Sequence, residues 1–293
     1  MKFELILVTL LIVIMVGCGN TENETQATKV TEEMTVNGIA DSIRYFRSNG
    51  LQTDILSRRT EDLSRKGAYE IQLAMLDQEV KSGRKLIGWK MGGTATADTA
   101  KYDPTFGYIL DSYLQKESGT MSSKMFPGGA IMMESEIGFV LKNDLPEGVT
   151  SIEELKSSID YVVGAIELAQ STAKPLEGKA LSPNHVVASG MGQVGTIKGS
   201  VQVAVDDFDF ENETVKCYVN DSLVVEGIVS NIFGTPLNAL FSLANLLPTE
   251  GKFLRAGDLV VTGSVYKNPL VSGAADVRVE FSSLGEIRFE SQE

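Results

Sequence analysis

Two glutamates stand one residue apart in an otherwise apolar stretch of the chain. Glu134 and Glu136 lie within residues 131–141, among methionine, isoleucine, phenylalanine and valine. Alternate residues of a β-strand project to the same face, so we expect the two carboxylates to lie side by side. Two like charges in apolar surroundings are costly unless a cation lies between them. For this pair alone, a solvated strand face with two exposed glutamates remains an alternative.

A third glutamate, Glu167, lies in a second apolar run over residues 161–169. Hard divalent cations such as Mg²⁺ and Mn²⁺ prefer carboxylate oxygens. With Glu167 as the third ligand, the pattern favours a metal site that keeps positions open for a substrate.

Composition and charge limit the classes of function. The chain has 293 residues, of which 43% are hydrophobic, and its formal net charge is −13. This length suffices for one large domain, or for a small and a large one. The acidic balance argues against nucleic-acid binding, which needs basic patches, and against a polyanionic substrate unless a metal recruits it.

The N-terminus predicts export. Lys2 precedes an apolar run over residues 5–16 that is too short to span a membrane and is typical of a signal-peptide core. The run ends in Met-Val-Gly-Cys, which resembles a bacterial lipobox. We therefore expect residues 1–17 to be a signal peptide, Cys18 to be lipidated, and the polar residues 18–36 to be a flexible tether. An ordinary secretory signal is the alternative.

The prediction for Cys18 bears on the second cysteine. If Cys18 carries lipid, Cys217 has no partner for an internal disulfide. Cys217 lies in an alternating segment over residues 215–219, where a small buried hydrophobic residue is the expected role.

The chain divides into a helical and a strand-rich part. Apolar residues recur at helical spacing from about 37 to 83, and short strand patterns begin at Lys85. We expect an α+β fold, with a mainly helical N-terminal part over residues 37–118 and a catalytic β part over 119–293. Local signals predict a capping box at Ser151 and Glu154, a hairpin around 220–222, a helix start at Thr235-Pro236, and a closing hairpin over 277–289.

Several segments together resemble one family, the 2-keto-4-pentenoate hydratases and their 4-oxalocrotonate decarboxylase relatives, within the fumarylacetoacetase superfamily. The resemblance extends from about Ala68 to Phe289. Each segment alone is a weak signal, and their common order and spacing make the resemblance specific. The matching segments cover residues 83–92 (Gly-Arg-Lys-Leu-Ile-Gly-Trp-Lys-Met-Gly), 104–107, 134–141, 165–168, 234–237, 243–245 and 254–264.

The resemblance implies a mixed β-roll of the fumarylacetoacetase C-terminal type, and Mg²⁺ or Mn²⁺ bound by Glu134, Glu136 and Glu167. It also implies a small 2-keto acid substrate that chelates the metal through its keto oxygen and carboxylate. The chemistry of the family is hydration of a 2-hydroxydienoate or decarboxylation of a vinylogous keto acid, through a dienolate that a divalent ion stabilises. Self-association into a homo-oligomer is a further implication.

Two more positions match the family's site. Lys90, in the setting Gly-Trp-Lys-Met-Gly, matches the active-site lysine. Its ammonium would offset the negative charge of three carboxylates, a divalent ion and a keto acid, and could move a proton. The turn Thr262-Gly263-Ser264 matches a turn at the substrate pocket. A lysine that reaches solvent and a plain strand-end turn are the respective alternatives.

The chain departs from the family at three places. Gln170 stands where the family has Asp, and a Gly-Leu-Thr after the lysine becomes Gly92-Gly93-Thr94. His185, the sole histidine, replaces part of an Asp-Asn pair close to Ser189. We take His185 and Ser189 as catalytic candidates, against the alternative that His185 is a packed or solvated loop residue.

Two classes of function follow. The first is a metal-dependent lyase acting on 2-keto acids, anchored to the bacterial membrane in the periplasm or at the cell surface. The second is a non-catalytic surface lipoprotein that binds a small carboxylate or a partner with the same fold, which Gln170 and His185 favour. A carbon–carbon hydrolase of the superfamily is disfavoured. The resemblance implies that such enzymes activate water with a His–Glu dyad in the N-terminal part, and no histidine precedes His185.

Overall fold

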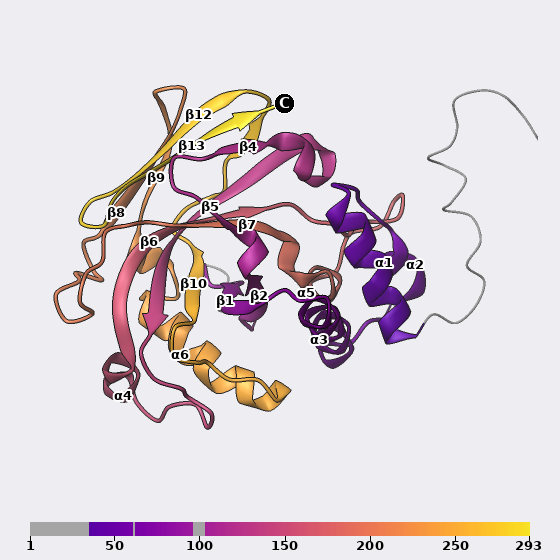
Figure 1. Cartoon of the computed structure of the whole chain (residues 1–293), viewed down its shortest axis with the longest axis horizontal. Helices are drawn as coiled ribbons and strands as arrows, with labels where there is room; N and C mark the ends of the chain where they lie inside the picture. Colours follow the sequence, from indigo (N-terminus) through magenta and orange to yellow (C-terminus); the bar gives the residue numbers. More distant parts are fainter. Residues whose placement is uncertain (1–34, 61, 96–102) are drawn as a thin grey trace, which may run out of the picture. The chain divides into compact units, whose positions relative to one another are not determined.

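Three helices precede the strands in the described part of the chain (Figure 1). The computed structural model describes residues 35–60, 62–95 and 103–293. The predicted signal peptide (1–17), Cys18 and most of the tether lie outside these residues. The helices are α1 (Val36–Ser48), α2 (Ile55–Arg59), α3 (Arg65–Lys81), α4 (Ile152–Ser157), α5 (Pro183–Ala188) and α6 (Pro236–Leu246).

A large mixed sheet forms the centre of the molecule. Its strands run in the order β2-β1-β10-β5-β6-β7-β3, with β11 paired to β5. β1 is parallel to β10, β3 is parallel to β7, and the other pairs are antiparallel. The strands are β1 (Leu86–Gly92), β2 (Thr105–Leu110), β3 (Leu114–Gln115), β5 (Ala130–Leu141), β6 (Ile159–Ala169), β7 (Gln193–Lys198), β10 (Leu259–Ser264) and β11 (Leu270–Ser272).

A second sheet has the strand order β4-β13-β12-β8-β9 and contacts the first where β13 packs against β6. Figure 1 shows it at the opposite end of the large sheet from α1, α2 and α3. Its strands are β4 (Thr120–Ser122), β8 (Thr214–Val219), β9 (Ser222–Ile228), β12 (Ala275–Phe281) and β13 (Gly285–Gln292).

The long strands are where apolar patterns predicted them, because each has at least one fully buried face. The buried residues of the central strands pack into one cluster that joins β2, β5, β6 and β10. This cluster consists of Ile109, Val140, Val163, Ala165, Leu259 and Val261. The boundary expected at residue 118 cuts through the large sheet, since β1, β2 and β3 precede it and pair with later strands.

The sequence predictions for the starts of α4 and α6 are confirmed in part. Ser151 Oγ accepts a hydrogen bond from the Glu154 amide at 3.1 Å, as the capping box predicts. The Glu154 carboxylate, however, bonds the amide and hydroxyl of Thr150 rather than the Ser151 amide. α6 begins at Pro236 as predicted, but the Thr235 hydroxyl makes no capping hydrogen bond.

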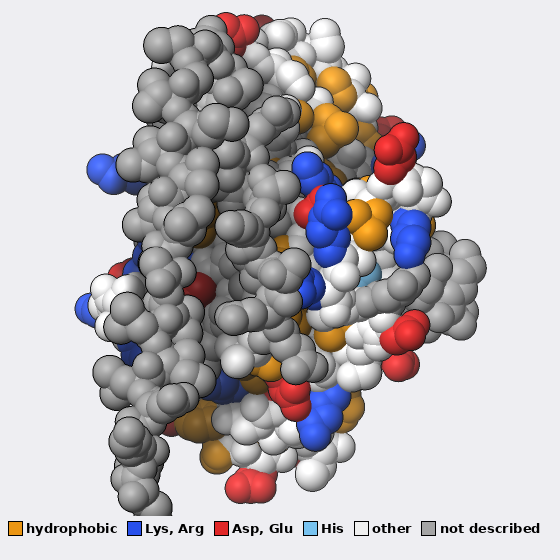
Figure 2. Space-filling view, turned by 90° about the vertical axis from the view of Figure 1, so that its right-hand side faces the viewer, with side chains coloured by type: hydrophobic (Ala, Val, Ile, Leu, Met, Phe, Trp, Pro, Cys, Tyr) orange, Lys and Arg blue, Asp and Glu red, His pale blue; other side chains and the backbone are white. Residues whose placement is uncertain are grey.

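Charges are interspersed on the face that carries the N-terminal helices. In Figure 2, basic and acidic side chains of the described residues lie close to one another on this face. The visible side chains of the described residues thus form no single acidic patch on this face. Among the residues described, none of the helices has both the length and the apolar character needed to cross a membrane.

Candidate metal centre

The pairing of β5 with β6 brings three carboxylates together. In the antiparallel register, Glu134 lies opposite Glu167 and Glu136 lies opposite Ala165. Glu134 and Glu136 share a face of β5, as the period of two predicts. One carboxylate oxygen from each of Glu134, Glu136 and Glu167 lies within 4.8 Å of the others.

The donor set fits a hard divalent cation. The side chains of Glu136 and Glu167 are fully buried, while Glu134 is half-buried and open to a cavity. Glu136 Oε1 and Glu167 Oε2 are buried without a hydrogen-bond partner among the described residues. Buried carboxylate oxygens need a donor or a cation, and oxygen-only ligation suits Mg²⁺ or Mn²⁺.

The carboxylates perturb one another. Burial raises the pKa of Glu136 well above its usual range, and the charges of Glu167 and Glu134 raise it further. Burial likewise raises the pKa of Glu167 to about 7, against the lowering effect of Lys90. Both shifts mean that the site tolerates its full negative charge poorly without a compensating cation.

Lys90 supplies one such cation from β1. Its side chain is buried, and Nζ forms an ion pair with Glu167 Oε1 and donates to the Met191 carbonyl at 3.2 Å. Burial lowers the pKa of Lys90, but the charges of Glu167, Glu134 and Glu136 outweigh this effect, so its pKa is raised. The lysine therefore lies beside the carboxylates and does not reach solvent.

Residues 262–264, predicted as a turn, are the last residues of strand β10, where its pairing with β5 is irregular, and they contribute in two ways. The Gly263 amide donates to Glu136 Oε2 and fixes that carboxylate. Thr262 is fully buried, and its hydroxyl donates to the Ile137 carbonyl at 2.9 Å. Thr262 thus ties β10 to β5, while Gly263 and Ser264 line the cavity.

A cavity of about 550 Å³ opens onto the carboxylates. Glu134 is the ligand candidate that lines it, together with the backbone of Gly92 and Gly93 after β1. The polar side chains Ser264, Tyr266 and Asn268 contribute further groups. The volume lies within the range of small-molecule sites.

The two remaining catalytic candidates are held by local hydrogen bonds. His185 Nδ1 accepts from the Ser182 amide at 3.4 Å and closes a capping box at the start of α5. His185 Nε2 lies 2.9 Å from the Thr60 carbonyl oxygen. The Ser189 hydroxyl donates to the Val186 carbonyl. These hydrogen bonds show that both side chains stabilise α5 and the segment that follows it.

Sequence reasoning missed two residues at the site. Met191 has a positive φ of 60°, which is uncommon for a residue other than glycine, and its carbonyl accepts from Lys90. Tyr266 lines the cavity, and its hydroxyl bonds Ser135 Oγ between the two glutamates of β5. The glycines that flank Met191 were a signal of unusual backbone. Tyr266 lies two residues after the predicted turn and carried no comparable signal.

Comparison with known proteins found chains of similar sequence and structures of similar fold. No protein-family model matches the chain. The chain is 26% identical over 223 residues to 4-oxalocrotonate decarboxylase of Pseudomonas putida. The aligned residues cover 75% of this chain and 83% of that protein. It is 27% identical over 259 residues to 2-keto-4-pentenoate hydratase of Paraburkholderia xenovorans strain LB400. The aligned residues cover 83% of this chain and 94% of that protein.

The chain is thus similar to curated 4-oxalocrotonate decarboxylases and 2-keto-4-pentenoate hydratases. The solved structure of 4-oxalocrotonate decarboxylase from Pseudomonas putida G7, complexed with magnesium and adipate, matches with a TM-score of 0.81 and 23% identity, over 87% of this chain and 97% of that one. Fumarylpyruvate hydrolase from Pseudomonas aeruginosa, in complex with Mn²⁺ and pyruvate, matches more distantly, with a TM-score of 0.53 and 12% identity over 71% of this chain and 89% of that one. The predicted fold class is confirmed as α+β, with N-terminal helices followed by a curled mixed β half-barrel of the fumarylacetoacetase type.

Proposed function

We propose that the chain is a divalent-metal-dependent lyase that acts on small 2-keto or 2-hydroxydienoic acids, as a hydratase or a decarboxylase. The observation that carries the proposal is the convergence of Glu134, Glu136 and Glu167 within 4.8 Å beside the buried Lys90. The relatedness to hydratases and decarboxylases supports the same reaction class.

The residues present fit the reaction. Glu134, Glu136 and Glu167 would hold Mg²⁺ or Mn²⁺, which supplies a Lewis acid for the keto oxygen and carboxylate of a substrate. Lys90 Nζ bears the proton that general acid–base chemistry moves to or from the substrate carbon. Asn268 Oδ1 lines the cavity without a hydrogen-bond partner among the described residues. It can accept a hydrogen bond from a water or a substrate hydroxyl.

Calorimetry of the full chain with Mg²⁺ and Mn²⁺ tests the metal site. We expect binding to the unmutated protein, and binding weakened at least about tenfold in Glu136→Gln. Glu290→Gln removes an exposed strand carboxylate of β13 and serves as the matched control, with no change expected. Absence of binding at millimolar metal, with and without oxalate as a co-ligand, would refute the proposal.

Turnover separates the lyase from the second function. Loss of ultraviolet absorbance of a 2-hydroxydienoate indicates hydration, and release of CO₂ from a vinylogous keto acid indicates decarboxylation. The non-catalytic alternative rests on Gln170 and His185. The Gln170 amide donates to the Ala130 carbonyl at 3.3 Å and accepts from the Ser171 amide at 2.9 Å, and the His185 ring bonds the Ser182 amide and lies 2.9 Å from the Thr60 carbonyl oxygen. Tight binding of metal and keto acid without turnover would favour that alternative.

We also propose that the chain is exported and anchored through a lipid on Cys18. The apolar run over residues 5–16 and the polar residues that follow Cys18 support this location.

A further inference from the structure

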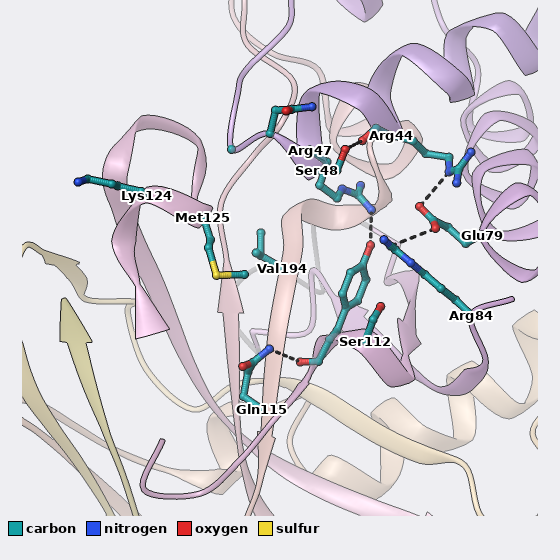
Figure 3. A pocket seen from close by; sticks show the side chains of 13 residues that line it. Arg44, Arg47, Ser48, Glu79, Arg84, Ser112, Gln115, Lys124, Met125 and Val194 are labelled. Atoms are coloured by element: carbon teal, nitrogen blue, oxygen red, sulfur yellow. Dashed lines mark hydrogen bonds and ion pairs between the residues drawn. The ribbon is translucent and has the colours of Figure 1, made fainter. Parts of the chain in front are cut away.

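A second cavity lies at the other end of the large sheet, between α1 and the start of β3. It measures about 390 Å³ and is lined by Arg44, Arg47, Arg84 and Lys124, and Glu79 is the one acidic residue that lines it in the described part of the chain. Figure 3 shows Arg44 and Arg84 reaching Glu79 from two directions, while Lys124 extends away from the arginines. A concentration of positive charge is unexpected in a chain with a net charge of −13.

Arg47 is the buried member of this group. It is 7% exposed, and its guanidinium donates to the hydroxyls of Tyr108 at 3.3 Å and Tyr113 at 3.2 Å, and to the Ser189 carbonyl. All three acceptors are uncharged. Arg47 Nε is buried without a hydrogen-bond partner, and no ion pair of Arg47 is formed among the residues that the structure describes.

An unpaired buried cation is costly. A charge removed from water is normally matched by an opposite charge, and leaving it unmatched costs several kcal/mol. The C-terminal end of α1 compensates in part, because a helix dipole favours a cation in the last turn. The dipole does not, however, provide a hydrogen-bond acceptor for Arg47 Nε.

Glu79 does not supply the missing charge to Arg47. Its Oε1 lies 2.9 Å from Arg44 Nε, and its Oε2 lies 3.0 Å from Arg84 Nη1. One carboxylate is thus shared between two guanidinium groups, which leaves the lining with a positive excess. The apolar side chains of Met125 and Val194 on the opposite wall suit a small organic body attached to an anionic group.

We propose that this cavity is a binding site for a small anion that bears a carboxylate or phosphate group, held by Arg47 and Arg84. Arginine is the residue best suited to such groups, because its planar fork matches their oxygens. The site is separate from the carboxylate cluster and does not depend on the proposed lyase activity.

The site nevertheless adjoins the candidate metal centre. Arg47 Nη2 donates to the Ser189 carbonyl, and a side chain at Gly190 would place its Cβ 2.6 Å from that nitrogen. The next residue, Met191, accepts from Lys90. Both sites therefore share the segment 189–191, and the test must distinguish anion binding at the arginines from anion binding at a metal.

Calorimetric titration of the full chain with inorganic phosphate and, separately, with succinate tests the proposal. EDTA is present, so that no metal recruits the anion, and the buffer has low ionic strength, because salt screens partly exposed charges. We expect saturable binding of at least one of the two anions. Binding of phosphate alone identifies a phosphoryl ligand, and binding of succinate alone identifies a carboxylate. No saturable binding of either at concentrations up to about 10 mM, the range of weak specific sites, would overturn the proposal.

Four variants of the full chain sharpen the test. Arg84→Gln should weaken binding roughly tenfold, since hydrogen bonds to charged groups contribute on that scale. Arg58→Gln, which removes an exposed arginine from its 2.8 Å ion pair with Asp54, is the matched control and should not change anion binding.

Glu79→Gln should tighten anion binding, because it frees Arg44 and Arg84. Glu136→Gln should leave it unchanged. Equal weakening by Arg84→Gln and Arg58→Gln would show a general charge effect and refute the site.

Discussion

Lys90 is the residue whose surroundings matter most for the proposed chemistry. Its ammonium pairs with the buried Glu167 carboxylate and donates to the Met191 carbonyl, and its side chain is 3% exposed. A buried carboxylate and a buried ammonium compensate one another, so removal of either leaves the other uncompensated. Lys90 therefore has a structural role in the metal-free protein besides the proton transfer that its position suggests.

Lys90→Met keeps the apolar stem and removes the charge. We expect the free energy of unfolding of the metal-free protein to fall by about 3 kcal/mol, because Glu167 is left buried and unpaired. We expect turnover in the presence of Mg²⁺ to fall by about a hundredfold or more. Urea denaturation in EDTA and a dienoate assay measure the two effects.

Lys252→Met is the control for this stability effect. Lys252 pairs with Asp77 at 3.4 Å on the surface, where an ion pair contributes little. A Lys90→Met protein as stable as the Lys252→Met protein would show that the buried pair is not a stabilising element. Full turnover in a folded Lys90→Met protein would remove Lys90 from the mechanism.

Cys217 gives a prediction for pH dependence. Burial raises the pKa of its thiol to about 11. In the unfolded chain the pKa is about 8.5, so the unfolded state loses its proton first as pH rises. The stabilising contribution is therefore complete below about pH 8.5 and is lost as pH rises toward about 11, by at most about 1.4 kcal/mol per pH unit.

Comparison with Cys217→Ala isolates this effect from other groups that titrate in alkali. The difference in free energy of unfolding between the two proteins should shrink as pH rises from 8 toward 11. A difference that stays constant with pH would show that the thiol titrates normally in the folded protein.

At the scale of elements, the parallel pair β1 and β10 positions the groups that surround the three carboxylates of β5 and β6. β1 carries Lys90, and β10 ends with Gly263 and Ser264. Gly88 lies opposite Leu259 in this pair, and a Cβ at Gly88 would lie 1.9 Å from the Leu259 carbonyl oxygen. The two strands approach closely because residue 88 has no side chain.

Gly88→Ala should therefore separate the two strands. We expect the free energy of unfolding to fall by about 2 kcal/mol or more, as for overpacked cores, and metal affinity to fall as Lys90 and the Gly263 amide move apart. Thermal denaturation and metal calorimetry measure both effects. Gly67→Ala in α3 is the control, since its Cβ would meet only side-chain atoms at 3.2 Å and beyond, and alanine favours a helix. Similar losses in both variants would contradict this account of β1 and β10.

At the scale of the whole molecule, the location of the protein is a prediction from its N-terminal residues. Residues 1–34 lie outside the part that the structure describes, so export and lipidation remain predictions from sequence. Self-association is likewise a prediction from the family resemblance.

Cys18→Ser tests the anchor. Lipid attachment needs the cysteine thiol, so the variant should move from the membrane fraction to the soluble fraction after cell breakage, while the unmutated chain stays with the membrane. Cys217→Ser, which changes the second cysteine, should leave the partition unchanged. Membrane partition that persists in Cys18→Ser would count against the lipid anchor.

Much of the candidate site was predictable from residue order. The period of two placed Glu134 and Glu136 on one strand face, and apolar context marked Glu167 as the third carboxylate. The strands around them were also predicted, because hydrophobic alternation and short buried runs are local properties of the sequence. Helices start after Ser151 and at Pro236 as predicted. The Ser151 hydroxyl makes the expected capping bond, and the Thr235 hydroxyl does not.

What the sequence did not determine depends on contacts between distant segments. The antiparallel register of β5 and β6 decides that Glu167 faces Glu134, and a shift by one residue would turn it to the other face. The packing of β1 beside β10 decides that Lys90 meets Glu167 and not solvent. The packing of α1 against the segment 189–191 decides that Arg47 is buried beside Ser189. Sequence pattern thus determined which groups are available for chemistry, and tertiary structure decided which of them meet, because strand register and helix packing are set by non-local contacts.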